Sequence, residues 1–232
     1  DYLDLTLLDG AVIGKNSDLL SILLQLGADV DPLDAAGATP LAGAGTVAEC
    51  NAQTRLLLEW GAEISNCAIS TKESFIESAL RHNTKIANLV KSEFGGRRCE
   101  IVNLSKRPDL IGKTCVVEKY LPDKGRYKVI FEVSKEVGLV GPENLKRRDR
   151  TPDDCGYYIS YKNGRTTRHE FASREECQEF VPSLAEEDAK AEAGAEQAAA
   201  SLLAELDLDS SEDSRVKMKG KQKKGKKKKG RK

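Results

Sequence analysis

The sequence predicts a multidomain chain: an α-helical solenoid, then a small β-barrel with a ββα extension, then a disordered tail. A helical segment that starts at Leu23 returns at Leu57, and short β-branched runs begin after Gly96. Aromatic residues vanish after Ser183. These changes place the predicted domains at residues 1–96, 97–150, 151–183 and 184–232.

The first element is the repeated helical segment. The stretch LLQLGADVD, which begins at Leu23, returns as LLEWGAEIS, which begins at Leu57. The spacing is close to the roughly 33-residue period of one common class of helical repeat. Gly27 and Gly61 follow the apolar runs, where a glycine can take the left-handed conformation that stops a helix. Each copy is therefore predicted to end a helix.

Between the copies lies Thr39-Pro40-Leu41-Ala42. Thr39 can cap a helix, and Pro40 suits the first helical position, where its missing N–H costs nothing. The segment resembles the Thr-Pro-Leu-His-x-Ala opening of ankyrin repeats, with Ala42 at the histidine position. We therefore expect about three ankyrin repeats, of which the last, from Glu73 to about Phe94, is degenerate or a cap.

The ankyrin resemblance implies a concave face that binds protein partners. Residue 1 is Asp rather than Met, and the first repeat lacks its usual preceding turn, so we expect an array truncated at its amino terminus. The predicted partner-binding residues of this face are Asp34, Ala38, Ala42, Thr46, Asn66, Ile69 and Ile76.

The next element is a set of short strands. Cys99–Leu104, Thr114–Leu121, Tyr127–Val133 and Val137–Val140 are β-branched or alternating runs separated by turn residues. Several short strands with tight turns predict a small barrel.

Two motifs within residues 98–148 resemble a small Src-homology-3-like or KOW-like barrel. They are the Pro-x-Leu-x-Gly element that ends at Gly112 and the Glu-Asn-Leu element that ends at Leu145. The resemblance implies a second interaction site without naming its ligand. Gly112 and Gly125 fit turns, which we favour over direct ligand contact because turn chemistry explains them.

A hairpin and a helix form the ββα extension. Asn163-Gly164 lies between two alternating runs, which is the strongest short-range hairpin signal. Ser173 and Glu176 fit a capping box, so a helix is predicted from Arg174 to Phe180, ending before Pro182. We expect this unit to pack on the barrel, because it is too small to be stable alone.

Tyrosines alternate with basic residues in this hairpin. Such a surface can stack bases and contact phosphates, although the tyrosines can equally fill the inner face of a strand while the charges stay in water. We favour the second interpretation. Predicted nucleic-acid contacts, should the first hold, are Tyr158, Lys162, Arg165 and Arg168, joined by Lys217, Lys219, Lys223 and Lys224 of the tail.

The carboxyl-terminal region changes character from Leu184. An Ala- and Glu-rich helix is predicted over Ala185–Leu206, followed by serines among acids over Asp207–Ser214. Lys217–Lys232 is a low-complexity basic tail that we expect to be disordered. The tail can bind nucleic acid or an anionic lipid surface through charge, or fold back onto the acidic segment.

The cysteine pattern and the charge balance limit the kinds of site and the cellular compartment that we expect for this chain. The 37 Lys and Arg residues balance the 37 Asp and Glu, and the six cysteines stand singly without CxxC spacing. We therefore expect no metal site and reduced, buried cysteines, in an intracellular protein that is cytoplasmic or nuclear. No run approaches the roughly 20 apolar residues of a membrane span.

The sequence carries no motif for catalysis. Phosphate-binding GxxxxGK, HExxH and GxSxG patterns are absent, and neither His82 nor His169 has an acid–base partner in its motif. The leading hypothesis is a non-enzymatic intracellular adaptor or scaffold that needs no cofactor and binds proteins of unknown identity. The alternative is a nucleic-acid-associated protein that uses the hairpin, barrel and tail.

Overall fold

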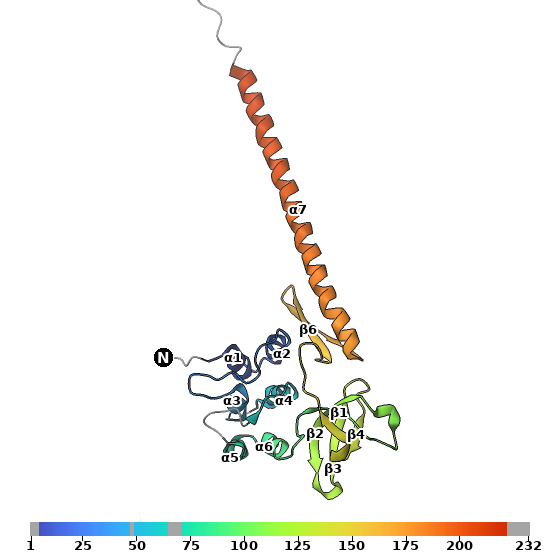
Figure 1. Cartoon of the computed structure of the whole chain (residues 1–232). Helices are drawn as coiled ribbons and strands as arrows, with labels where there is room; N and C mark the ends of the chain where they lie inside the picture. The colour runs from blue at the N-terminus through green and yellow to red at the C-terminus, as the bar shows by residue number, and fades with distance from the viewer. Residues whose placement is uncertain (1–4, 47–48, 65–70, 222–232) are drawn as a thin grey trace, which may run out of the picture. The chain divides into compact units, whose positions relative to one another are not determined.

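The computed structural model describes residues 5–46, 49–64 and 71–221, and only the backbone over 203–221. Contacts between residues divide the chain into two compact units, Asp1–Glu179 and Phe180–Lys232. The first unit holds three helix pairs, a sheet and a hairpin (Figure 1). The four-part division predicted from the sequence stays a prediction.

Three helix pairs form the amino-terminal part. The first helices of the pairs lie side by side, α1 against α3 and α3 against α5, and the second helices follow the same order (Figure 1). The six helices are α1 (Leu7–Ile13), α2 (Ser17–Gln25), α3 (Pro40–Thr46), α4 (Asn51–Glu59), α5 (Lys72–His82) and α6 (Thr84–Val90).

Local chemistry sets the helix ends. Thr6 and Asp9 form a capping box at the start of α1, and the side chain of Asn16 caps α2. Gly27 and Gly61 have φ values of 86° and 96°, so both take the left-handed conformation that ends a helix. This part of the sequence prediction is confirmed.

A five-stranded antiparallel sheet follows the helices. Its strand order is β4-β3-β2-β1-β5, and one face packs a core that includes Val117, Val129 and Phe131. The strands are β1 (Arg98–Ile101), β2 (Thr114–Leu121), β3 (Arg126–Phe131), β4 (Val137–Val140) and β5 (Leu145–Arg147).

The prediction of a closed barrel is wrong. Within the described residues, β4 pairs with β3 and β5 pairs with β1, and no ladder joins β4 to β5. The two edge strands are only four and three residues long. The signal of short runs and tight turns therefore indicated a sheet but not its closure.

The hairpin consists of β6 (Tyr157–Lys162) and β7 (Arg165–Glu170), with the predicted Asn163-Gly164 turn. It packs on helix α2: the Ile159 N–H donates to the side-chain oxygen of Gln25 at 3.0 Å, and the amide nitrogen of Gln25 donates back to the Ile159 carbonyl at 3.4 Å. The hairpin therefore contacts the helical part, whereas the sequence predicted that it packs on the barrel.

Helix α7 (Arg174–Lys221) runs through Pro182, so the predicted stop before this proline is wrong. Strong helix formers on both sides compensate for the single lost donor, and the Ser183 hydroxyl donates to the Phe180 carbonyl at 2.7 Å. The helix includes the predicted range 185–206, and most of the predicted basic tail lies beyond the described residues. No helix in the described part is long and apolar enough to cross a membrane.

The ankyrin assignment needs correction. Its motifs have local explanations: Thr39 accepts the N–H of Ala42 at 3.3 Å as a cap, and the two glycines end helices. Any short helix pair can use this chemistry. From Arg98 onward the first unit is mainly antiparallel sheet, so the motifs indicate helix pairs and not a family.

Candidate protein-binding surface

The residues predicted for a concave binding face act mostly in turns and caps. Both Ala36 and Ala38 donate their N–H groups to the Asp34 carboxylate, at 2.9 and 2.8 Å. Ala42 donates to a cap, and Ile76 is half-buried in α5. Thr46 ends α3, while Asn66 and Ile69 lie outside the described residues.

The predicted nucleic-acid residues of the hairpin fall on two faces. Tyr158, Lys162 and Arg165 share one face, because Lys162 pairs with Arg165 and Tyr158 is four positions from Lys162. Arg168 lies on the other face, with its guanidinium carbon 3.8 Å from the centre of the Tyr157 ring. Three of the four predicted contact residues, Tyr158, Lys162 and Arg165, therefore lie on one face of the hairpin.

The lysines predicted for the tail are only partly within the structure. Lys217 and Lys219 lie in α7, where the structure describes only their backbone. Lys223 and Lys224 lie outside the described residues.

A surface that sequence reasoning missed lies on the first helix pair. Leu19, Leu23 and Leu26 follow one another at i, i+4 and i+7 along α2, so they line one face of the helix. Leu19 is 41% exposed, Leu26 is 75% exposed, and Leu23 is half-buried. Leu7 of α1 is 77% exposed as well. We call Leu19, Leu23 and Leu26 the leucine face.

The equivalent face of the second helix pair is covered. Gln53, Leu57 and Trp60 occupy the same places on α4, and each is at least 94% buried. Gln53 donates to the Ser17 hydroxyl of α2 at 2.9 Å, and the Trp60 indole donates to the Tyr157 hydroxyl at 3.4 Å. The covering elements are thus a preceding helix and the hairpin.

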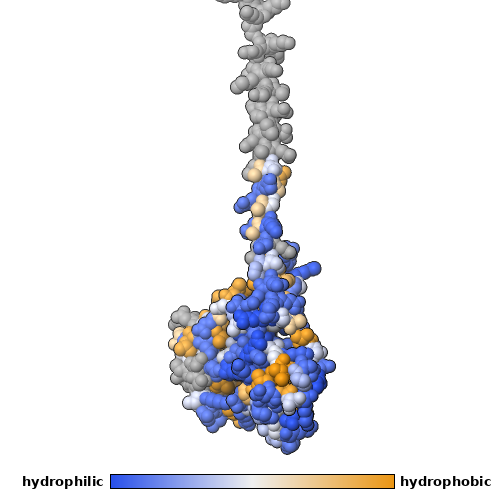
Figure 2. All heavy atoms as spheres, turned by 45° about the vertical axis from the view of Figure 1, so that its right-hand side comes forward, coloured by the Kyte–Doolittle hydropathy of each residue, from blue (hydrophilic) through white to orange (hydrophobic). Residues whose placement is uncertain are grey.

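A second exposed apolar patch lies at the edge of the sheet. Ile130 and Val137 are directly opposite each other on β3 and β4, and Leu139 is exposed two residues further on. Figure 2 shows orange areas interrupted by blue on the visible side of the folded part, so apolar groups reach the surface in several places. We call Ile130, Val137 and Leu139 the edge patch.

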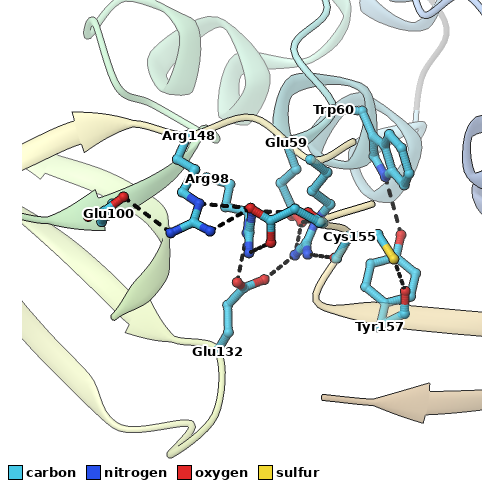
Figure 3. Close-up of polar contacts among 10 residues, drawn as sticks. Glu59, Trp60, Arg98, Glu100, Glu132, Arg148, Cys155 and Tyr157 are labelled. Atoms are coloured by element: carbon cyan, nitrogen blue, oxygen red, sulfur yellow. Dashed lines mark hydrogen bonds and ion pairs between the residues drawn. The ribbon is translucent and has the colours of Figure 1, made fainter. Parts of the chain in front are cut away.

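The folded part also contains a buried network of arginines and carboxylates (Figure 3). The Arg98 side chain is 2% exposed. Its Nε donates to Glu132 at 2.8 Å, and its Nη2 donates to Asp154 at 3.1 Å. Arg98 thus links β1 to the residue after β3 and to the loop before β6.

Arg150 and Arg148 extend the network. Arg150 donates to Glu59 of α4 at 2.8 and 3.0 Å and also contacts Glu132 and the Cys155 carbonyl. Arg148 joins Asp154 at 2.8 Å to Glu100 of β1 at 3.2 Å. The helices, the sheet and the hairpin loop are therefore held by the same set of charges.

The electrostatics keep these groups charged. Burial acts to raise the pKa of Glu132, but Arg150 and Arg98 lower it to about 2. Burial likewise opposes the charge of Arg150, and Glu59 and Glu132 raise the pKa of its guanidinium. Because the acids and bases neutralise one another in pairs, we interpret the network as structural.

The Tyr157 side chain connects this network to the helices. Its hydroxyl lies 3.1 Å from the Ser21 hydroxyl of α2 and accepts the Trp60 N–H. The guanidinium carbons of Arg150 and Arg168 lie 4.9 and 3.8 Å from the ring centre. A cation over a tyrosine ring is attracted by the electron density of its face. Tyr157 thus fills the inner face of its strand, whereas Tyr161 of the same strand is 68% exposed.

The described cysteines, Cys50, Cys99, Cys115, Cys155 and Cys177, are buried and unlinked, as predicted, and Cys67 lies outside the described residues. Among the described side chains, no three of His, Cys, Asp or Glu are grouped so that they could hold a metal ion.

Comparison with known proteins gives no family. No family model matches the chain, and no curated protein matches it. The assignments to ankyrin repeats and to a Src-homology-3-like or KOW-like barrel are therefore wrong, and the surfaces described above have to be interpreted from their own geometry.

Proposed function

We propose that the chain is a non-enzymatic protein-binding adaptor and that the leucine face is its main binding surface. One observation supports this most: the positions equivalent to Leu19, Leu23 and Leu26 on α4 are buried by a helix and the hairpin. An uncovered copy of a helix-receiving face, built entirely from leucines, suits an amphipathic helix of a partner protein.

The energy of such an interaction would come from the leucines. Fully burying one leucine side chain contributes about 1.5–3 kcal/mol, so the three leucines can supply a specific contact once the costs of association are met. Leu20 and Leu24, on the neighbouring side of α2, are fully buried and hold the helix in place. The leucine face therefore needs little rearrangement before binding.

The edge patch is the candidate for a second contact site. Ile130 and Leu139 are 37% and 42% exposed, and β4 is an edge strand that pairs only with β3 among the described strands. Two modest sites on one chain gain avidity when a partner can reach both.

A second candidate function is nucleic-acid binding by the hairpin. Tyr158, Lys162 and Arg165 share one face of β6 and β7, and an aromatic ring beside two cations can stack a base and contact phosphate. We rank this function second, because Arg168 points to Tyr157 instead.

The test compares matched variants of the full chain in capture from nuclease-treated cell extract, followed by cross-linking and mass spectrometry. The adaptor proposal expects a discrete partner, cross-linked near α2, that is lost with Leu19→Glu plus Leu26→Glu. Leu202→Glu, at a 60% exposed leucine of α7, is the control and should retain the partner. Retention of the partner by the double variant would contradict the proposal.

The alternative has a separate measurement. Fluorescence anisotropy with a single-stranded oligonucleotide, at low and high salt, should show binding that weakens with salt and with Lys162→Glu plus Arg165→Glu. If these charge reversals leave the affinity unchanged, the hairpin does not bind nucleic acid.

A further inference from the structure

Two buried sulfur atoms touch each other beside the charge network. The Sγ atoms of Cys155 and Cys177 are 3.5 Å apart, and the two residues are 0% and 1% exposed. They come from separate elements, the loop before β6 and the first turn of α7, and are 22 positions apart in the sequence. Their contact is therefore made by the fold and not by neighbouring sequence.

The surroundings of Cys155 fix its position. Asp154, the residue before it, accepts hydrogen bonds from Arg98 and Arg148, and the Cys155 carbonyl accepts one from Arg150. Gly156, the residue after it, has a φ of 71°, which a glycine adopts without strain. The backbone that carries this thiol is thus held on both sides.

Cys177 is held by the start of α7. Its N–H donates to the Ser173 carbonyl at 3.4 Å, and the Ser173 hydroxyl accepts the N–H of Glu176 at 3.2 Å. The capped first turn therefore points the second sulfur at the first. A disulfide requires the two sulfur atoms to approach to roughly 2.05 Å.

We propose that Cys155 and Cys177 are an oxidation site, at which a peroxide converts the two thiols into a disulfide that ties α7 to the hairpin loop. One thiol attacks the peroxide, the O–O bond breaks, and a sulfenic acid and water form. The second thiol then attacks that sulfur, and a second water leaves with the proton. Two thiols and one hydrogen peroxide thus give one disulfide and two waters.

A cavity that can hold a small oxidant is lined by sequence neighbours of the pair. A cavity of about 490 Å³ is lined by Asp154 and Gly156, the two neighbours of Cys155, and by Ser173 and Arg174 at the start of α7. Hydrogen peroxide is small enough to enter such a space.

Burial sets the rate of the reaction. Desolvation, and the neighbouring Cys177, raise the pKa of Cys155 to about 12, so the thiol is protonated at neutral pH. Since the thiolate is the nucleophile, the reaction should be slow at neutral pH and faster in mildly alkaline solution.

In the experiment, the native full chain is exposed to hydrogen peroxide at neutral pH and at mildly alkaline pH. Free thiols are then blocked with N-ethylmaleimide, and the cross-linked peptides are mapped by mass spectrometry with and without a reducing agent. The expected result is one reducible cross-link, between Cys155 and Cys177, that forms before any other cysteine pair is oxidised and forms faster at the higher pH.

The internal controls are cysteines of the same chain. Cys99 and Cys115 are directly opposite each other across β1 and β2, and both are fully buried. A cross-link between these two, one that involves Cys67, or oxidation of Cys155 without cross-linking would overturn the proposal.

Variants extend the test. Cys177→Ser should abolish the cross-link, whereas Cys50→Ser, at a buried cysteine whose thiol contacts the Val12 carbonyl, should preserve it. The disulfide should also raise the urea midpoint of the native chain, an increase that a reducing agent reverses. This measurement needs no variant, so an unchanged midpoint together with no cross-link would overturn the proposal even if Cys177→Ser fails to fold.

Discussion

Arg98 on β1 and Glu132, the residue that follows β3, form an ion pair of 2.8 Å in the protein interior, where their side chains are 2% and 13% exposed. Glu132 also contacts Arg150, whose other partner, Glu59, belongs to α4. One carboxylate therefore holds two arginines that come from different parts of the fold. The consequences of this arrangement can be measured.

Replacing Glu132 with glutamine should strongly destabilise the first unit. The change leaves two buried guanidinium groups without their shared counter-charge, which costs about 3–5 kcal/mol for a buried pair. Urea unfolding followed by circular dichroism gives the free energy. The matched control is Glu170→Gln, because Glu170 pairs with Lys135 at the surface, where such pairs contribute about 0–1 kcal/mol. Equal losses in the two variants would contradict the structural interpretation of the network.

Acid should weaken the fold through the same carboxylate. The pKa of Glu132 is lowered from 4.5 to about 2 in the folded chain, so below pH 4.5 the unfolded chain binds the proton first. The stabilisation by Glu132 is complete above that pH and is lost as the pH falls toward 2. Unfolding free energies measured across this window should fall with pH, and fall less steeply in Glu132→Gln. Identical slopes would show that Glu132 is not the titrating group.

Two glycines of α3 should respond oppositely to alanine. A Cβ on Gly45 would lie 2.3 Å from Cε2 of the buried Phe75, whereas a Cβ on Gly43 would meet no atom within 4 Å. Gly45→Ala should cost about 1–3 kcal/mol by overpacking α3 against α5. Gly43→Ala should stabilise by about 0.5–1 kcal/mol, because alanine favours the helix. Thermal melts of the pair decide this, and a stabilising Gly45→Ala would show that the two helices pack less tightly.

Equivalent positions on α2 and α4 should differ in stability and in binding. Trp60→Ala should cost about 3–5 kcal/mol, because the indole is buried against Tyr157. Leu26→Ala should change the unfolding free energy by less than about 0.5 kcal/mol, because its side chain is largely in water. The proposed partner should nevertheless bind the Leu26 variant more weakly. A large loss of stability in Leu26→Ala would indicate that this leucine is covered within the chain.

Local signals in the sequence predicted most elements correctly. The Asn163-Gly164 turn, the strands and the helix ends at Gly27 and Gly61 all depend on residues close together in the chain. Closure of the sheet and continuity of α7 through Pro182 depend on pairing and on the helix context, so the same signals failed there.

The candidate surfaces were harder to predict. Arg98 and Glu132 are 34 positions apart, and Arg150 and Glu59 are 91 apart, so no local pattern joins them. A local hint was the group Arg147, Arg148 and Arg150. Aligning the two copies of the repeated segment pairs Leu19 with Gln53 and Leu26 with Trp60. This alignment points to the leucine face only when the exposure of the four side chains is known.

The charge network also determines when the partners of Arg98 become available while the chain is being synthesised. Arg98 is made 56 residues before Asp154, one of its two partners. A nascent chain that has emerged only as far as β5 already contains Glu132 but lacks Asp154, so only one of the two acidic partners of Arg98 is available to it. The second partner arrives with the loop that leads into the hairpin, and a chain that stops short of that loop leaves Arg98 without Asp154.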